Sequence, residues 1–134
     1  MLRLILHSVE VSENSEQTQA IVTLQNGEKQ FVGRATRLST NDDFIIVAQA
    51  TLDAVRQALA LDIELELDKA APIRHDSIDK NILVVTVDYT KDGKTLQLTG
   101  TCLSNDEQVV HNIAKATLDA TNRLIVYLTE TENS

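Results

Sequence analysis

The pentapeptide Ala-Thr-Leu-Asp-Ala occurs twice in this chain of 134 residues, at residues 50–54 and at residues 116–120. The second copy follows the first by 66 residues (116 − 50), which is about half the chain. Two pairs typical of tight hairpins, Asn26-Gly27 and Asp92-Gly93, share this offset, and Asn26-Gly27 predicts a type I′ turn. Repetition at a fixed spacing indicates tandem copies of one supersecondary unit. The sequence therefore predicts a single domain over residues 1–134 that consists of two related halves, 1–61 and 62–134.

The first half predicts three strands and a helix. Alternating apolar and polar side chains predict strands over residues 2–11, 18–25 and 29–38. Hydroxyl, amide and acidic side chains at residues 39–43 predict the start of a helix over residues 42–61, because they accept hydrogen bonds from free N–H groups and favour the positive end of the helix dipole. The apolar residues that recur in this helix at steps of three and four, and so mark its buried face, are Phe44, Ala48, Leu52, Val55 and Leu59.

The second half repeats this plan. Residues 63–67 alternate like a short strand, although they could also extend the first helix, and a longer connection over residues 68–80 contains the single proline, Pro72. A strand over residues 81–89 and a further strand with Leu96, Leu98 and Cys102 on one face are expected next.

The sequence Ser104 to Glu107 has the form of a capping box and predicts a last helix over residues 105–128. Residues 129–134 are polar and acidic and are expected to fray. Together, the two halves predict an α+β fold. In this fold a tandem βββα repeat makes one six-stranded antiparallel sheet, and both helices cover the same face of it.

Composition excludes several classes of partner. The formal net charge is −8, so the summed field disfavours nucleic acid and anionic membranes. Aromatic residues make up 3% of the chain and tryptophan is absent, which argues against base-stacking surfaces. No apolar run reaches the roughly 18 residues of a membrane span. The lone cysteine, Cys102, cannot form an internal disulfide. These features predict a cytoplasmic protein that binds neither nucleic acid nor membrane.

No recognised catalytic or metal-binding motif is present. The three histidines lack zinc-protease spacing, and there is no Walker loop, dinucleotide fingerprint or serine elbow. We therefore predict no catalytic residue, metal or cofactor. Cys102 lies on the expected apolar face of its strand and is predicted to be a buried, slowly reacting thiol. Arg74 and His75 lie in the polar stretch after Pro72, where they indicate either a solvated loop or an anion contact.

Two glycines lie within strands that precede the two helices, Gly33 and Gly100. A glycine inside a strand usually marks a bulge or a close approach by another group. Either a helix crosses at these points, or a ligand or second backbone does. The ligand-binding hypothesis therefore rests on Gly33, Gly100, Arg74 and His75.

The repeated pentapeptides place an aspartate, Asp53 or Asp119, at the same point of each helix. The pair could form a two-carboxylate site across a pseudo-twofold axis, or each could lie on the solvent-facing flank of its helix. Alanines at spacing four beside them let each helix approach a neighbouring element closely. This structural role accounts for most of the repeat.

Two tandem units of three strands and a helix, each with a glycine in the strand before the helix, resemble the C-terminal regulatory domain of 2-isopropylmalate synthase. The resemblance spans most of the chain and rests on layout. That family has Gly-Pro-Val-Asp-Ala at each helix start, whereas residues 41–43 and 105–107 here contain neither glycine nor proline. The resemblance implies pairing of two such domains and a small-molecule pocket between the repeats. No leucine-binding residue is carried over.

The strand over residues 81–89 is apolar on both faces, with Leu83, Val85 and Val87 on one and Ile82 and Val84 on the other. A strand of this kind needs cover on both sides, and twofold self-pairing is the commonest way to supply it. The sequence thus predicts a homodimeric, non-catalytic binding or regulatory module that acts on a partner protein or a small metabolite. The alternatives are an assembly adaptor without a ligand and a small enzyme.

Overall fold

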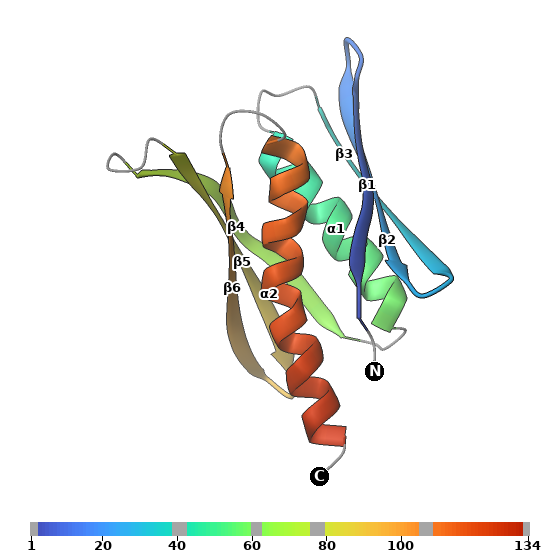
Figure 1. Cartoon of the computed structure of the whole chain (residues 1–134), viewed down its shortest axis with the longest axis vertical. Coiled ribbons are helices and arrows are strands. Elements are labelled where there is room, and N and C mark those ends of the chain that lie inside the picture. The colour runs from blue at the N-terminus through green and yellow to red at the C-terminus, as the bar shows by residue number, and fades with distance from the viewer. Residues whose placement is uncertain (1–2, 39–42, 60–62, 76–79, 105–108, 133–134) are drawn as a thin grey trace.

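The computed structural model describes residues 3–38, 43–59, 63–75, 80–104 and 109–132. Both halves follow the order strand, strand, strand, helix (Figure 1). The first half contains β1 (Ile5–Glu13), β2 (Gln17–Asn26), β3 (Lys29–Leu38) and α1 (Asp43–Leu59). The second half contains β4 (Glu64–His75), β5 (Lys80–Lys91), β6 (Lys94–Ser104) and α2 (Val109–Glu132). The predicted α+β class, with two helices and antiparallel strands, is confirmed.

The strands form two sheets of three strands, in the orders β1-β2-β3 and β4-β5-β6. Both helices lie between the sheets (Figure 1). α1 packs on β2 and β3 and also contacts β4, while α2 packs on β5 and β6 and also contacts β1. The two helices contact each other as well. The prediction of one six-stranded sheet with both helices on one face is therefore wrong.

Helix α1 explains why the two sheets do not join. β3 and β4 are edge strands, and α1 lies between them. The backbone N–H of Arg34 in β3 donates to the Asp53 carboxylate, with 3.0 Å between nitrogen and oxygen. The carbonyl of Leu65 in β4 accepts a hydrogen bond from the Arg56 guanidinium. At these points the backbone groups of both edge strands are hydrogen-bonded to side chains of α1. They are therefore not available for pairing between β3 and β4.

Strand β4 is much longer than the predicted segment 63–67, and most of the expected connection belongs to it. Pro72 lies within β4, opposite Leu83 of β5. An edge strand tolerates proline because the missing N–H can lie on the side without a strand partner. Helix α2 extends to Glu132, so residues 129–132 are helical rather than frayed. The predicted helix starts at residues 39–42 and 105–108, including most of the capping box, lie outside the described residues.

Both predicted tight hairpins are present, and their turns differ. Asn26 pairs with Lys29, so the first loop consists of Gly27, with φ of 63°, and Glu28. Asp92 (φ 54°) is the one described residue other than glycine that has a positive φ, so the φ of Glu28 is negative. A loop with positive φ at its first residue alone is a type II′ turn. The second loop consists of Asp92 and Gly93, both with positive φ, as type I′ requires. The type I′ prediction for Asn26-Gly27 is wrong because the loop lies one residue further along.

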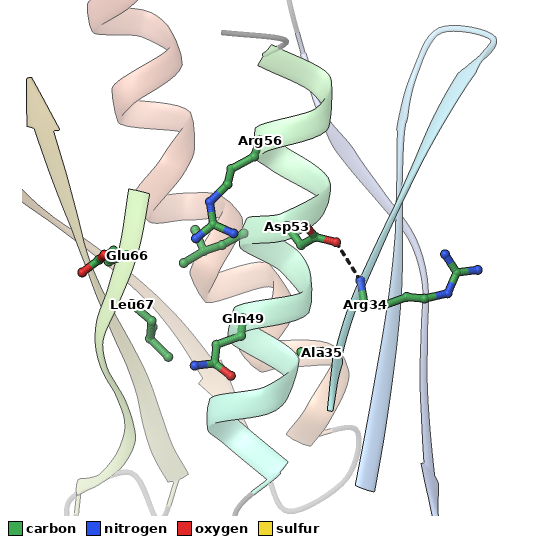
Figure 2. Close-up of a pocket in the computed structure, with 8 residues that line it drawn as sticks. Arg34, Ala35, Gln49, Asp53, Arg56, Glu66 and Leu67 are labelled. Carbon is green, nitrogen blue, oxygen red and sulfur yellow. Dashed lines mark hydrogen bonds between the residues drawn. The ribbon is translucent and has the colours of Figure 1, made fainter. Parts of the chain in front are cut away.

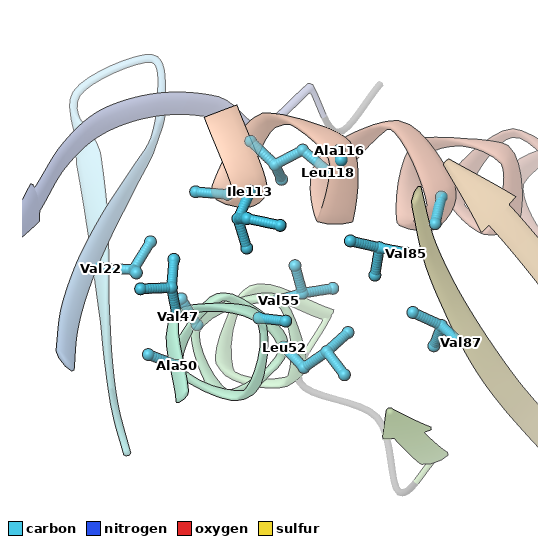
Figure 3. Close-up of a cluster of buried hydrophobic side chains, with 14 of the residues drawn as sticks. Val22, Val47, Ala50, Leu52, Val55, Val85, Val87, Ile113, Ala116 and Leu118 are labelled. Carbon is cyan, nitrogen blue, oxygen red and sulfur yellow. The ribbon is translucent and has the colours of Figure 1, made fainter. Parts of the chain in front are cut away.

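One hydrophobic core fills the space between the sheets. Figure 3 shows Val22 of β2 on one side of the helices and Val85 and Val87 of β5 on the other. The predicted buried face of α1 is confirmed, with Leu52 and Val55 fully buried. Burial also extends to Ala50 and other residues around the helix, because α1 meets a sheet on one side and α2 and β4 on the other. A helix that is apolar around most of its circumference is typical of such an interior position.

Candidate functional site

The two strand glycines are contact points for the helices. A Cβ atom at Gly33 would lie 2.5 Å from the backbone nitrogen of Ala54 and closer still to the carbonyl oxygen of Ala50. A Cβ atom at Gly100 would meet the carbonyl oxygen of Ala116 in the same way. Both glycines are buried under their own helix. The helix-crossing interpretation is therefore confirmed, since helix backbone fills the space that a ligand would need.

The repeated aspartates serve the same two contacts. Asp53 accepts from the N–H of Arg34, the residue after Gly33, and Asp119 accepts from the N–H of Thr101, the residue after Gly100, at 3.0 Å in each case. Both carboxylates are half-buried and lie on different helices, each against its own strand. Each carboxylate is therefore the hydrogen-bond partner of a strand edge. The aspartates form neither the predicted shared carboxylate site nor a solvent-facing flank.

Arg74 and His75 lie at the end of β4 rather than in a loop. They are paired with Asn81 and Lys80 of β5 in the sheet register. Arg74 is exposed, and the side chain of His75 lies outside the described part of the structure. The structure places Gly33 in the other sheet, so the four candidate ligand-binding residues do not form one cluster. Their role in ligand binding remains a prediction.

A cavity of about 380 Å³ lies between α1, β3 and β4, where the two halves of the chain meet. The residues that line it are Arg34, Ala35, Gln49, Leu52, Asp53, Arg56, Glu66 and Leu67 (Figure 2). Its volume lies within the roughly 300–1,000 Å³ of small-molecule sites. The small-molecule pocket that the resemblance implies between the repeats stays a prediction.

The charged side chains that line this cavity either form hydrogen bonds within the protein or point away from the cavity. Asp53 accepts from Arg34 and also from the amide of Gln57, and Arg56 donates to the Leu65 carbonyl. Figure 2 shows the guanidinium of Arg34 directed away from α1 and the carboxylate of Glu66 directed outward from β4. Asp53 and Arg56 therefore hold the two strand edges, which is a structural role.

The outer face of the β4-β5-β6 sheet carries an apolar surface at one end. Ile73, Ile82 and Leu103 are direct cross-strand neighbours, and Ala71 and Val84 lie in the next row. Ile73 and Leu103 are each 55% exposed, Ala71 is exposed, and Ile82 and Val84 are half-buried. We call these five residues the β4–β6 patch. Sequence reasoning found Ile82 and Val84 but missed Ile73, because residues 68–80 were expected to be a connection.

The part of the chain that the structure describes contains no group of three or more His, Cys, Asp or Glu side chains placed to hold a metal ion. Within the same residues, no helix has both the length and the apolar character needed to cross a membrane. Cys102 is half-buried rather than buried, and packs against the core. Its prediction as a buried thiol is wrong, because β6 is an edge strand and α2 covers only part of it.

Comparison with known proteins gives no assignment for this chain: no protein-family model matches the sequence, and no curated protein matches it.

Proposed function

We propose that this protein is a non-catalytic binding module that works as a homodimer, with the β4–β6 patch as the contact between copies. The exposed cross-strand row of Ile73, Ile82 and Leu103 carries this proposal. Three adjacent aliphatic side chains on the open face of a sheet form a contiguous apolar surface, and even patches of a few hundred Å² are often functional.

The charges on this face favour a second copy as the occupant. The apolar rows lie at one end of the face, and Glu66, Asp68 and Asp88 gather toward the other. A twofold axis through the apolar end places the apolar rows of the two copies against each other. It also keeps the acidic ends of the two copies apart. A chain with a net charge of −8 needs this separation, because two copies repel each other overall.

The edges of β3 and β6 are less suited to pairing between copies. Gln57 donates to the carbonyl of Val32 with a nitrogen–oxygen distance of 2.8 Å, and Asp53 accepts from Arg34, so α1 covers part of the β3 edge. Asp119 covers the β6 edge at Thr101 in the same way. An edge whose backbone groups already have partners is a poor template for another strand. At β3 and β6, a face-to-face contact is therefore favoured over edge pairing.

The size of the patch sets the expected strength of the dimer. Strands about 4.8 Å apart and same-face residues about 6.8 Å apart give roughly 200 Å² of sheet for three strands and the two rows of the patch. A standard interface buries about 800 Å² from each partner. Contact over the patch alone falls well below this value, so we expect a weak, reversible dimer that forms at high protein concentration.

Light scattering across a concentration series tests this proposal. The mass should rise with concentration from 14.8 kDa toward twice that value. Leu103→Lys should hold the protein at the monomer mass, because it places a charge within the apolar contact. Val126→Lys is the matched control, since Val126 is 51% exposed on α2 and lies outside the patch. A monomer mass for the unmodified protein at high concentration would refute the homodimer and favour an adaptor that binds a different protein.

The two halves support a duplication as the origin of this module. Gly33 lies opposite Val22, and Gly100 lies opposite Val85, in corresponding hairpins. The strand before each hairpin contains a register shift, between residues 6 and 8 in β1 and between residues 67 and 69 in β4. Under this proposal the layout shared with the 2-isopropylmalate synthase regulatory domain would reflect a regulatory role in the cytoplasm. The small-enzyme alternative has no specific observation in its favour.

A further inference from the structure

A second pocket, of about 540 Å³, lies where the end of the β5–β6 hairpin meets the C-terminal half of α2. Figure 1 shows the turn of this hairpin beside the lower part of α2. Six residues form its apolar and cationic surfaces: Tyr89, Lys91, Lys94, Leu96, Tyr127 and Leu128. The chain has two tyrosines, and both line this pocket.

Strand register places four of these side chains on one face. Tyr89 pairs with Leu96, and Lys91 pairs with Lys94 two residues further toward the turn. Side chains two residues apart in a strand point to the same side of the sheet. The lysines therefore lie on the face that carries Tyr89, which is 4% exposed and belongs to the core.

The apolar wall of the pocket is only partly covered by the protein itself. Leu96 is 45% exposed although it lies on the core face of its strand, and Tyr127 on α2 is 52% exposed. Small-molecule sites of this size are lined by apolar and aromatic side chains with a few polar groups that fix orientation. The exposed Leu96 and Tyr127 side chains match the first of these requirements.

The two lysines provide the polar groups that would fix the orientation of a ligand. Like charges directly opposite each other on neighbouring strands are destabilising, and Lys91 faces Lys94 in this way. Asp92 also lines the pocket, so the three charged residues leave an excess of one positive charge in a chain whose net charge is −8. An anionic group bound between the lysines would relieve their repulsion.

We propose that this pocket binds a small organic anion with an apolar body about the size of a six-membered ring. The carboxylate or phosphate of the ligand lies between Lys91 and Lys94, and its body packs against Tyr89, Leu96 and Tyr127. This inference extends the proposed binding function to a ligand class. It does not depend on the dimer, because the pocket and the β4–β6 patch lie on opposite faces of the same sheet.

Tyrosine fluorescence of the full chain provides the test, because tryptophan is absent and both tyrosines line the pocket. The probes are cyclohexanecarboxylate and cyclohexyl phosphate, which add little absorbance of their own. The controls are cyclohexylmethanol, which lacks the charge, and acetate and inorganic phosphate, which lack the body. We expect at least one of the two ring anions to change the emission saturably, with half-saturation at about 0.1–1 mM. We expect the controls to bind at least tenfold more weakly.

The variants separate the lysine contact from a general charge effect. Lys91→Ala with Lys94→Ala should weaken binding at least tenfold, and Lys91→Arg with Lys94→Arg should retain it. Lys69→Ala with Lys115→Ala, which removes two exposed lysines elsewhere, should bind as the unmodified protein does. The monomeric Leu103→Lys variant should also bind normally, which distinguishes failure of this inference from failure of the dimer. No saturable response to either ring anion, or an equal response to cyclohexylmethanol, would overturn the proposal.

Discussion

Replacement of Gly33 by alanine tests how closely α1 approaches β3. The added Cβ would lie 2.5 Å from the nitrogen of Ala54 and 3.0 Å from its Cβ, with the carbonyl oxygen of Ala50 closer still. Comfortable carbon contacts are about 3.5–4.0 Å, so the helix must move by about 1 Å. Overpacking of this kind costs about 1–3 kcal/mol. We expect a value near 3 kcal/mol, because the obstacles are backbone atoms and no rotamer change relieves them.

This cost is large enough to measure in a chain of this length. With an unfolding entropy of about 2.1 cal/mol/K per residue, 3 kcal/mol lowers the melting temperature by roughly 10 °C. Urea denaturation followed by circular dichroism gives the free energy of unfolding directly. Thr36→Ala is the matched control, since Thr36 is exposed on the same strand and its loss should change stability by less than about 0.5 kcal/mol.

A second substitution identifies the obstacle. Ala54→Gly in the Gly33→Ala background removes one Cβ and leaves the Ala50 carbonyl and the Ala54 nitrogen in place. It should therefore fail to restore stability. Full recovery would show that the contact is between side chains, and an unchanged stability of Gly33→Ala itself would show that α1 does not lie this close to the strand.

Three further expectations concern the contacts around the helices. Asp53→Ala leaves the Arg34 N–H without its acceptor and should cost about 1–3 kcal/mol in urea denaturation; no loss would show that water replaces the carboxylate. Leu52→Ala opens a cavity at a fully buried position between the sheets and should cost about 2–5 kcal/mol by the same measurement, whereas a cost below 1 kcal/mol would contradict its place in the core. Cys102, which is half-buried, should react with a thiol reagent to completion in the native protein but more slowly than in urea, and equal rates would place the thiol in open solvent.

Local sequence patterns predicted the strands well where turn residues and the alternation of apolar and polar side chains define the ends of the strand. β3 matches its predicted range of residues 29–38, because the preceding turn and the alternation fix both ends. The strand over residues 81–89 was found and is three residues longer, as Lys80–Lys91. The extension of β4 through Pro72 was missed, because proline is compatible with a strand only at a sheet edge, and edge position is a property of the assembled sheet.

The candidate sites were harder to predict than the elements. Gly33 and Gly100 were identified from sequence as points of close approach, and the structure shows that the approaching group is a helix. Tyr89 and Tyr127 are 38 residues apart (127 − 89) and lie on different elements, so no local pattern joins them. Their shared pocket exists because the β5–β6 hairpin ends beside the last turns of α2.

The sequence by itself determined the order of strands and helices, the hairpins and the residues that each helix buries, since these depend on turn chemistry and on periods of two and 3.6 residues. Only the tertiary structure decided that six strands form two sheets. That outcome depends on long-range contacts, in which Asp53 and Arg56 of α1 take the edge positions that β3 and β4 would otherwise offer each other. Because the helices pack on the inner face of β4, β5 and β6, the β4–β6 patch on the outer face is left toward solvent, where it is the proposed surface for a second copy.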